Sequence, residues 1–222
     1  LELLAQELRA RHGVHTRIVE LDLADPDLLT ALARATAGIE VGLAVYNAAH
    51  SVQGEFLERP LDDHLRAIDL NCRGPLVFAH FFGDAMRARG RGGLILMSSL
   101  SGLQGTAMVA TYAATKAFNT VLAEGLWEEL RGHGVDVLAC IAGATRTPTF
   151  ERSEPAEGGS LARPMEAIQV AREALAALGR GPSMIPGHLN RAASLVMRVL
   201  PRARAVSLIS SATRRMYGAR KR

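Results

Sequence analysis

Short apolar runs alternate along this chain with longer stretches of helical periodicity, and this alternation constrains the fold more than any other feature. Strands that are joined through helices run parallel, and their helices cover both faces of the sheet. The pattern therefore predicts an α/β fold with a doubly wound parallel sheet. Strands are expected at residues 16–21, 41–46, 92–98, 135–142 and 183–186, and helices at 1–12, 26–37, 60–89, 109–132, 164–179 and after 188.

Composition agrees with one globular domain. The chain has 222 residues, of which 48% are hydrophobic and 22% charged, and it has no apolar run long enough for a membrane span. Its first residues form an acid-containing amphipathic helix and not a signal peptide. Cys72 and Cys140 fall inside expected elements, which favours buried free thiols in a reducing, cytoplasmic compartment over a disulfide. The seven histidines show no paired metal spacing, so no metal site is expected.

Tyr112 and Lys116 form the most informative pair of polar residues. On a helix, positions i and i+4 share a face, so the phenol and the ammonium are expected to point into one cleft. An unperturbed tyrosine titrates near about 10, and a neighbouring ammonium lowers that pKa toward the range of a general acid or base. The pair alone is also compatible with a half-buried tyrosine beside a surface lysine.

Further candidates lie where two expected strands end. Ser99 follows the apolar run 94–97, and small residues follow the run 41–46 in Asn47-Ala48-Ala49. Reactive groups and ligands gather at the carboxyl ends of strands in open α/β sheets, and small side chains let a ligand approach the backbone. His50 follows the second of these turns and is a weaker candidate for lining the cleft.

With these motifs in order, the chain resembles the short-chain dehydrogenase/reductase family from about residue 1 to 187, nearest to its hydroxysteroid and long-chain 3-oxoacyl reductase branch. The resemblance implies a Rossmann-type sheet, a nicotinamide cofactor (NAD or NADP, with NADP favoured by family habit) and a homo-oligomer. It implies a small-molecule carbonyl or alcohol substrate, and the branch suggests a lipophilic ketone. The matching residues are Asn71, Ser99, Tyr112 and Lys116 for the catalytic tetrad, and Asp22, Leu23, Asn47, Ala48, Ala49, Tyr112, Lys116, Gly143 and Thr147 for cofactor contacts.

The resemblance also implies a role for each group. Tyr112 exchanges a proton with the substrate oxygen, and Ser99 donates a hydrogen bond to that oxygen. Lys116 lowers the tyrosine pKa and binds the nicotinamide ribose. Asn71 holds, through its backbone, a water that links Lys116 to solvent. Thr147 holds the carboxamide and Asp22 meets the adenine.

The chain departs from the family pattern in two ways. Tyr46, Ala49 and Ala142 replace an Asn, a Gly and a Pro of the family motifs, which is expected to tune cofactor affinity. No Gly-rich turn follows a strand near Leu1, so the family's first two strands and its phosphate-binding turn are expected to be absent. The strand at 16–21 would then lack a partner, which predicts an amino-terminally truncated and marginally stable fragment.

The carboxyl-terminal part suggests two further expectations. Residues 1–187 are expected to form the incomplete Rossmann-type domain, with 147–163 as a substrate lid, and 188–222 a basic helical extension. From Arg202 to Arg222 there are six arginines, one lysine and no acid, so 202–222 is either a solvated helix or a peripheral contact with a membrane or an acyl carrier. No nucleic-acid motif accompanies this charge. A non-catalytic dinucleotide sensor and a membrane- or partner-binding scaffold remain as alternative functions.

Overall fold

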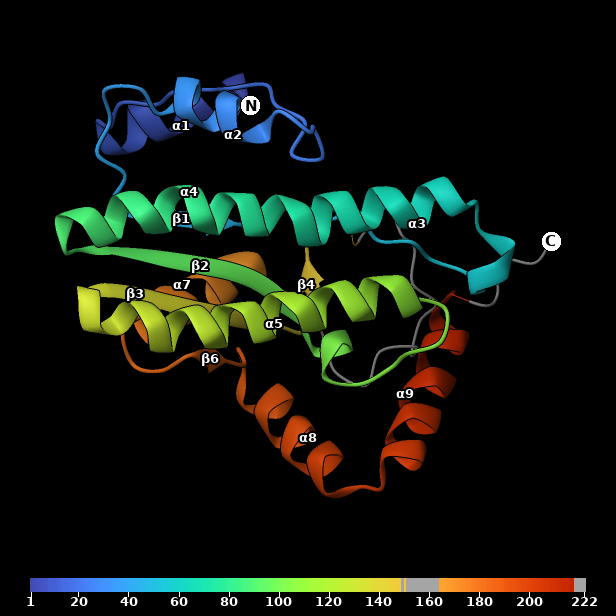
Figure 1. The fold of residues 1–222 in the computed structure, drawn as a ribbon. Helices are drawn as coiled ribbons and strands as arrows, with labels where there is room; N and C mark the ends of the chain where they lie inside the picture. The colour runs from blue at the N-terminus through green and yellow to red at the C-terminus, as the bar shows by residue number, and fades with distance from the viewer. Residues whose placement is uncertain (149, 151–163, 218–222) are drawn as a thin grey trace.

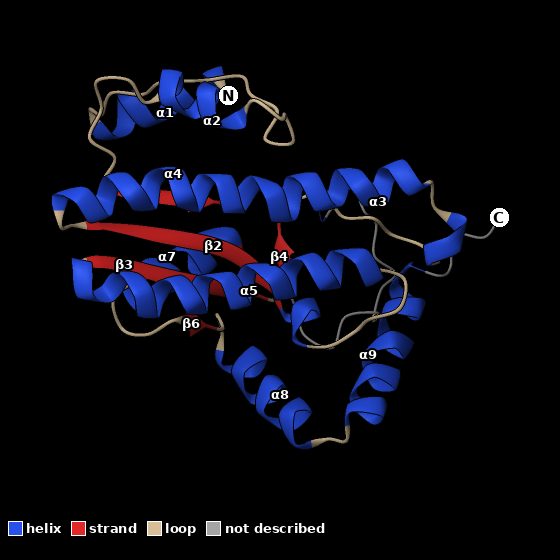
Figure 2. Ribbon diagram, viewed as in Figure 1, coloured by secondary structure: helices blue, strands red, loops and turns tan. Residues whose placement is uncertain are grey.

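The computed structural model describes residues 1–148, 150 and 164–217. Its centre is a four-stranded parallel sheet in the order β1-β2-β3-β6. Helices cover both faces of this sheet, as the sequence predicts: α4 and α5 lie on one face and α7 on the other (Figures 1 and 2). The strands are β1 (Leu43–Tyr46), β2 (Gly92–Ser99), β3 (Val135–Ala142), β6 (Ser183–Met184) and a separate parallel pair, β4 (Thr145–Arg146) and β5 (Met165–Glu166).

The helices agree with the expected ranges to within a few residues, with one interruption and one split described below. They are α1 (Glu2–His12), α2 (Leu28–Ala35), α3 (Leu61–Ile68), α4 (Gly74–Arg89), α5 (Ala110–Leu130), α7 (Ala167–Ala177), α8 (His188–Val199) and α9 (Arg202–Tyr217). Short helical turns are η1 (Phe56–Glu58), η2 (Asp69–Arg73), η3 (Leu100–Leu103) and η4 (Arg131–His133).

Strict alternation along the central strands divides the core into two layers. In β2, Leu94 and Leu96 face α4 and α5, whereas Ile95 faces α7. In β3, Val137 packs with the first layer and Leu138 with the second. Side chains of a strand point alternately to its two faces, so a strand that is apolar at every position must be covered on both sides. The continuous apolar runs of the sequence thus account for the doubly wound architecture.

The strand expected at 16–21 does not form, and this prediction was wrong. A strand exists only through hydrogen bonds to a neighbouring strand, and none of the described strands lies beside this segment. It runs instead without regular structure between α1 and α2, where Arg17 donates a hydrogen bond to the carbonyl of Ala35 at 2.8 Å. β1 is an edge strand of the described sheet, paired with β2 alone. The expected absence of two strands and a Gly-rich turn stays a prediction.

Other boundaries differ for local reasons. α2 begins at Leu28 and not at Pro26, because Asp25 first accepts a hydrogen bond from the N–H of Asp27 at 2.7 Å and forms a turn. The helix expected from residue 164 begins at Ala167, since the two residues before it pair with β4. The terminal helix is split by Pro201 into α8 and α9.

The helix expected across 60–89 is interrupted at its most important residue. Between α3 and α4, residues Asp69–Arg73 form one π-helical turn that contains Asn71. Pro75, four positions after Asn71, has no N–H, so the carbonyl of Asn71 cannot receive the usual α-helical hydrogen bond. The sequence therefore interrupts the regular α-helix at Asn71, the residue expected to take part in proton transfer.

Candidate active site

One cavity of about 1130 Å³ lies at the carboxyl ends of β1, β2 and β3. Ser99 is the last residue of β2, and both Tyr112 and Lys116 reach the cavity from α5. Of the residues expected to contact the cofactor, those that line it are Asn47, Ala49, Tyr112, Lys116, Gly143 and Thr147. The topology thus brings together groups that are spread over 100 positions of the sequence, at the edge where open α/β sheets bind ligands.

Tyr112 and Lys116 share one face of α5, as their spacing predicts. The Nζ atom of Lys116 lies 5.7 Å from the centre of the Tyr112 ring, within range of a cation–π contact. Lys116 is 3% exposed and donates a hydrogen bond from Nζ to the carbonyl of Met97 at 2.8 Å. The ammonium is therefore held between the tyrosine and strand β2.

Burial controls the protonation of both groups. It raises the pKa of Tyr112, an effect that the hydrogen bond with Ser99 opposes and the nearby phenol of Tyr217 reinforces. Burial also lowers the pKa of Lys116 to about 8. The direction for Tyr112 is opposite to the one expected from Lys116, because loss of solvation has the largest effect on the pKa of the phenol. Tyr112 is thus a neutral phenol at neutral pH, the form that can donate a proton.

Ser99 is fixed by the turn that follows β2. Its hydroxyl accepts a hydrogen bond from the N–H of Ser101 at 3.2 Å and caps the short helix η3. Gly102 in this turn approaches α5 so closely that a Cβ there would lie 2.7 Å from the backbone nitrogen of Ala117. Only glycine permits this approach, which holds the Ser99 turn against the helix that carries Tyr112.

Asn71 is fully buried and does not line the cavity. Its side-chain amide donates to the carbonyl of His50 at 2.8 Å and to the hydroxyl of Thr115 at 3.0 Å, and its Oδ1 accepts from the N–H of His50 at 2.8 Å. The side chain therefore ties the loop after β1 to α5. His50 takes part through its backbone and does not line the cavity.

Three of the expected cofactor residues, Asp22, Leu23 and Ala48, do not line this cavity. Asp22 is exposed and accepts hydrogen bonds from the N–H of Ala24 at 2.9 Å and from Arg66 at 3.1 Å. These two contacts, the backbone one first, lower the pKa of its carboxyl group. A role of Asp22 with adenine stays a prediction.

The sequence reading missed the contribution of α8 and α9 to the cavity. Residues of α9 that line it recur at helical spacing on one face: Leu208, Ile209, Ala212, Thr213, Met216 and Tyr217. This apolar periodicity was present in the basic tail and is the signal that could have identified the face. The lid expected at 147–163 lies mostly outside the described residues.

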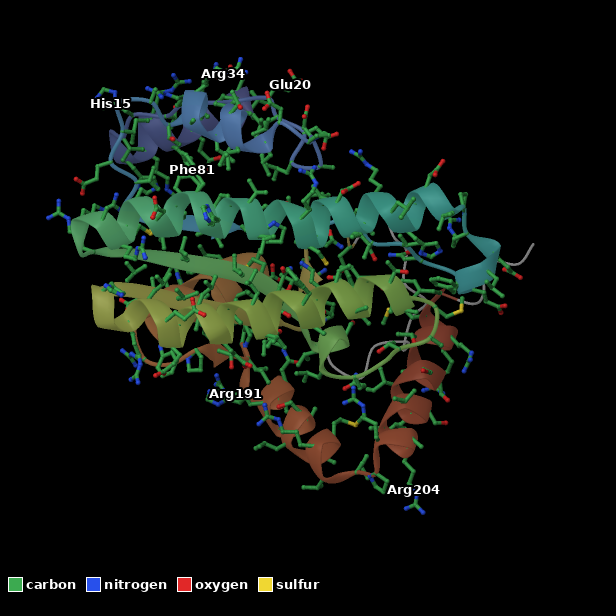
Figure 3. The ribbon with its side chains drawn as sticks, in the orientation of Figure 1. His15, Glu20, Arg34, Phe81, Arg191 and Arg204 are labelled. Atoms are coloured by element: carbon green, nitrogen blue, oxygen red, sulfur yellow. The ribbon has the colours of Figure 1, made fainter. Side chains whose placement is uncertain are left out.

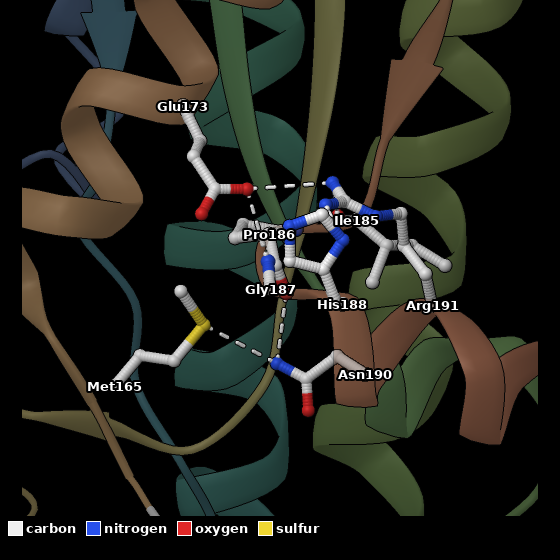
Figure 4. A network of polar contacts seen from close by, with 8 residues as sticks. All are labelled: Met165, Glu173, Ile185, Pro186, Gly187, His188, Asn190 and Arg191. Carbon is white, nitrogen blue, oxygen red and sulfur yellow. Dashed lines mark hydrogen bonds and ion pairs between the residues drawn. The ribbon is translucent and has the colours of Figure 1, made fainter.

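Both helices are attached to the body of the protein at named points. The carboxylate of Glu173 in α7 accepts from the N–H of Gly187 at 3.0 Å and from Arg191 at 3.4 Å, which fixes the start of α8 (Figure 4). Asn190 donates to the carbonyl of Pro186 at 2.9 Å in the same network. A Cβ at Gly143 would lie 2.7 Å from Nδ2 of Asn190, so glycine is required at this motif position for packing against α8.

α9 is attached to the turn that follows Ser99. Arg202 donates a hydrogen bond to the carbonyl of Leu103 at 2.9 Å, and the N–H of Ala107 donates to the hydroxyl of Ser210 at 3.0 Å. Ser210 is buried, as are two small residues of the same helix, Ala205 and Ala212. The helix therefore packs closely on the active-site turn.

Three further expectations concern metal binding, the cysteines and membrane spans. Within residues 1–148, 150 and 164–217, no group of three or more His, Cys, Asp or Glu side chains is arranged to hold a metal ion. Both cysteines are free thiols; Cys140 is buried as expected, whereas Cys72 is only partly buried. None of the described helices combines the length and the apolar character that a membrane span requires.

Comparison with known protein families gives a match along most of the chain. Residues 1–158 match the family model for short chain dehydrogenases. The chain is 29% identical over 191 residues to a 7beta-hydroxysteroid dehydrogenase of Clostridium sardiniense, covering 86% of this chain and 73% of that protein. It is 32% identical over 142 residues to a very-long-chain 3-oxoacyl-CoA reductase of Pyricularia oryzae, covering 62% and 43% respectively.

Solved structures show the same fold. A structure from a study of 7beta-hydroxysteroid dehydrogenase stereoselectivity superimposes with a TM-score of 0.85 at 26% identity, covering 94% of this chain and 81% of the other. A short-chain dehydrogenase of Sphingobium yanoikuyae in complex with NADPH superimposes with a TM-score of 0.76 at 28% identity, covering 91% and 83%.

Proposed function

This chain belongs to the short-chain dehydrogenase family of NAD(P)-dependent oxidoreductases, and we propose that it interconverts a lipophilic ketone and its alcohol. The observation that carries the proposal is the placement of Ser99, Tyr112 and Lys116 around one large cavity at the carboxyl ends of the strands. A buried neutral phenol beside a hydroxyl and a cation is suited to carbonyl reduction, in which oxygen gains negative charge and then a proton.

In this mechanism each side chain has a separate role in the reaction at the substrate oxygen. Ser99 donates a hydrogen bond to it and stabilises the charge that develops there. Tyr112 donates its proton to the same oxygen, or accepts it in the reverse direction. Lys116 stabilises the phenolate that results, since a cation favours the charged form of a neighbouring acid. The carbonyl of Asn71, in the π-helical turn, would hold a water that links Lys116 to solvent and returns its proton.

The residues present fit a nicotinamide cofactor. Asn47 and Ala49 follow β1, and Gly143 and Thr147 follow β3, so small and polar groups line the sheet edge on both sides of Lys116. Lys116 would bind the ribose hydroxyls and Thr147 the carboxamide, while Asp22 would meet the adenine and residues 47–49 the adenosine side. The nicotinamide, when bound, supplies or accepts the hydride. NADP is the preferred form in this proposal, as in the Sphingobium yanoikuyae structure with NADPH.

The cavity supports a neutral, lipophilic substrate. Apolar side chains from three helices face it, including Val170 of α7, Met197 of α8 and Met216 of α9. Among its described lining residues, Lys116 is the one charged side chain. A site of this kind binds apolar surface and orients it through a few polar groups. The names of the relatives, hydroxysteroid dehydrogenase and very-long-chain 3-oxoacyl-CoA reductase, point to the same class of substrate.

Three further expectations belong to this proposal. The chain acts in the cytoplasm as a homo-oligomer. Residues 1–187 form the catalytic domain, with 147–163 as its lid, and residues 188–222 form an extension that completes the substrate site. The basic segment 202–222 makes a peripheral membrane contact.

Two alternative functions make different predictions. A dinucleotide sensor would bind NADPH without transferring hydride. A scaffold would neither bind NADPH nor transfer hydride. The raised pKa of Tyr112 and the attachment of α9 to the turn after Ser99 favour the enzyme, since a sensor needs no proton donor and a scaffold needs no tail facing the cavity.

Isotope transfer separates these functions. The chain is incubated with NADPH deuterated at C4, in separate reactions for each face of the ring, and with a steroid ketone, a long-chain 3-oxoacyl thioester or a small water-soluble ketone. We expect deuterium in the alcohol formed from a lipophilic ketone, from one labelled face only. NADPH binding without transfer would support the sensor, and neither binding nor transfer would support the scaffold.

A further inference from the structure

Helix α8 exposes an apolar stripe that nothing in the described structure covers. Leu189, Ala192, Val196 and Val199 recur at three- and four-residue spacing, so they lie along one side of the helix. Val199 is 82% exposed and Leu189 76% exposed, and Leu195 beside the stripe is 62% exposed. Single exposed apolar residues are ordinary, but a contiguous exposed stripe marks an interaction surface.

The charge around this stripe has one sign. From His188 to Tyr217 the chain has six arginines and no aspartate or glutamate. Within the described part of the chain, Arg191 is the one of these that pairs with an acid, Glu173. Arg198 and Arg204 are exposed on either side of the turn that joins α8 to α9. An apolar stripe beside unneutralised arginines is the pattern of a helix that binds in the plane of a membrane surface.

The shape of the hairpin matches this chemistry. α8 and α9 form a V whose turn, at Leu200 and Pro201, is directed away from the sheet (Figure 1). Arg204 extends outward near this turn (Figure 3). The turn can therefore reach a surface before the rest of the molecule does.

The same hairpin forms the rim of the substrate cavity. Leu189, Val196 and Leu208 line the cavity and are also about half exposed or more, which places them at its opening. A surface that covered the apolar stripe would therefore lie against the mouth of the site.

We propose that the α8–α9 hairpin docks the protein on an anionic lipid bilayer, with the apolar stripe at the headgroup–acyl boundary and the arginines on lipid phosphates. The cavity then opens toward the acyl chains, and a lipophilic substrate enters without crossing water. This consequence rests on the proposed function, and the docking itself deepens the membrane contact proposed there for 202–222 by adding α8 and its apolar stripe. A second copy of the chain fits the surface less well. A two-fold interface must be self-complementary, and this surface would oppose arginines to arginines without an acid between them.

Vesicle co-sedimentation tests the docking without any turnover. The full chain is mixed with vesicles of phosphatidylcholine, or of phosphatidylcholine with phosphatidylglycerol, at low and high salt. We expect binding to the anionic vesicles that weakens as salt is raised. Absence of binding at low salt, or equal binding to both vesicles, would overturn the proposal.

Two variants and their matched controls locate the surface. Val199→Glu introduces a charge into the stripe, and Leu57→Glu does the same at a 92% exposed leucine in η1. Arg198→Gln with Arg204→Gln removes two charges at the turn, and Arg11→Gln with Arg34→Gln removes two from the α1–α2 segment; Arg34 and Arg204 lie at opposite ends of the molecule (Figure 3). We expect each hairpin variant to weaken vesicle binding about tenfold or more, with the controls unchanged.

The outcomes remain distinct from failure of the proposed enzyme. None of the six residues substituted in the four hairpin and control variants lies in the cavity lining, so turnover of a small water-soluble ketone should be unchanged in all four variants. Light scattering on the same samples reports the oligomeric state. If Val199→Glu dissolves a dimer and leaves vesicle binding intact, the stripe is an interface between copies and the lipid proposal is wrong.

Discussion

Lys116 donates a hydrogen bond from its buried ammonium to the backbone carbonyl of Met97, 2.8 Å away. Met97 stands two residues before Ser99 in β2. The same strand therefore carries the serine hydroxyl at its end and binds the ammonium of Lys116 through its backbone. Neighbouring Ser98 donates from its hydroxyl to the carbonyl of Lys116 at 2.7 Å. The strand thus fixes the backbone and the side chain of Lys116 at once, and with them the face of α5 that carries Tyr112.

Replacing Lys116 by Met should change how stability depends on pH. The folded-state pKa of Lys116 is about 8, below its ordinary 10.5, so between these values the unfolded chain binds more protons than the folded one. The free energy of unfolding of the wild type should therefore rise relative to Lys116→Met from pH 8 toward 10.5, by at most about 1.4 kcal/mol per pH unit. Denaturant titrations at several pH values measure this difference, and a difference independent of pH would show that Lys116 is not held in a desolvated site.

Gly102→Ala should damage the site through the turn that carries Ser99. The new Cβ would lie 2.7 Å from the nitrogen of Ala117 and 2.8 Å from the carbonyl carbon of Lys116, so the turn must move away from α5. We expect a loss of stability of about 1–3 kcal/mol and a lower kcat. Gly105→Ala is the matched control, because a Cβ there has no neighbour within 4 Å. Equal behaviour of the two variants would contradict the close approach.

Tyr217 should act on substrate size and on the titration of Tyr112. Tyr217→Ala removes a ring from the cavity wall and should raise KM for a bulky ketone while leaving a small ketone almost unaffected. Tyr217→Phe keeps the ring and removes the phenol that raises the pKa of Tyr112, so the alkaline limb of the pH–rate profile should move to lower pH. Ser207→Ala, at an exposed position of α9, is the control. If the two ketones respond alike to Tyr217→Ala, α9 does not form the substrate wall.

The central part of the fold was predictable because its signals are local. The continuous apolar runs that become β2 and β3 can be buried only between two layers of helices, and the i, i+4 spacing of Tyr112 and Lys116 decides that they share a face. The strand expected at 16–21 failed because pairing depends on a neighbour that the segment's own sequence does not specify. Alternation alone cannot provide that partner.

The site was predictable to a smaller extent, since its electrostatics depend on burial. A nearby ammonium was expected to lower the pKa of Tyr112. Instead, the packing of α5 against β2 and α9 removes water from the phenol, and this desolvation raises its pKa. The role of α9 required the contacts of Arg202 with Leu103 and of Ser210 with Ala107, which join positions about one hundred residues apart. No local pattern specifies contacts of that range.

Tyr112→Phe tests the account most directly, because the ring keeps its packing and only the titratable oxygen is lost. With a lipophilic ketone and NADPH, we predict that turnover falls by about 10²–10⁴-fold, the usual contribution of a positioned proton donor, while NADPH affinity stays close to that of the wild type. A variant that keeps more than about a tenth of the wild-type rate would contradict the assignment of Tyr112 as the proton donor.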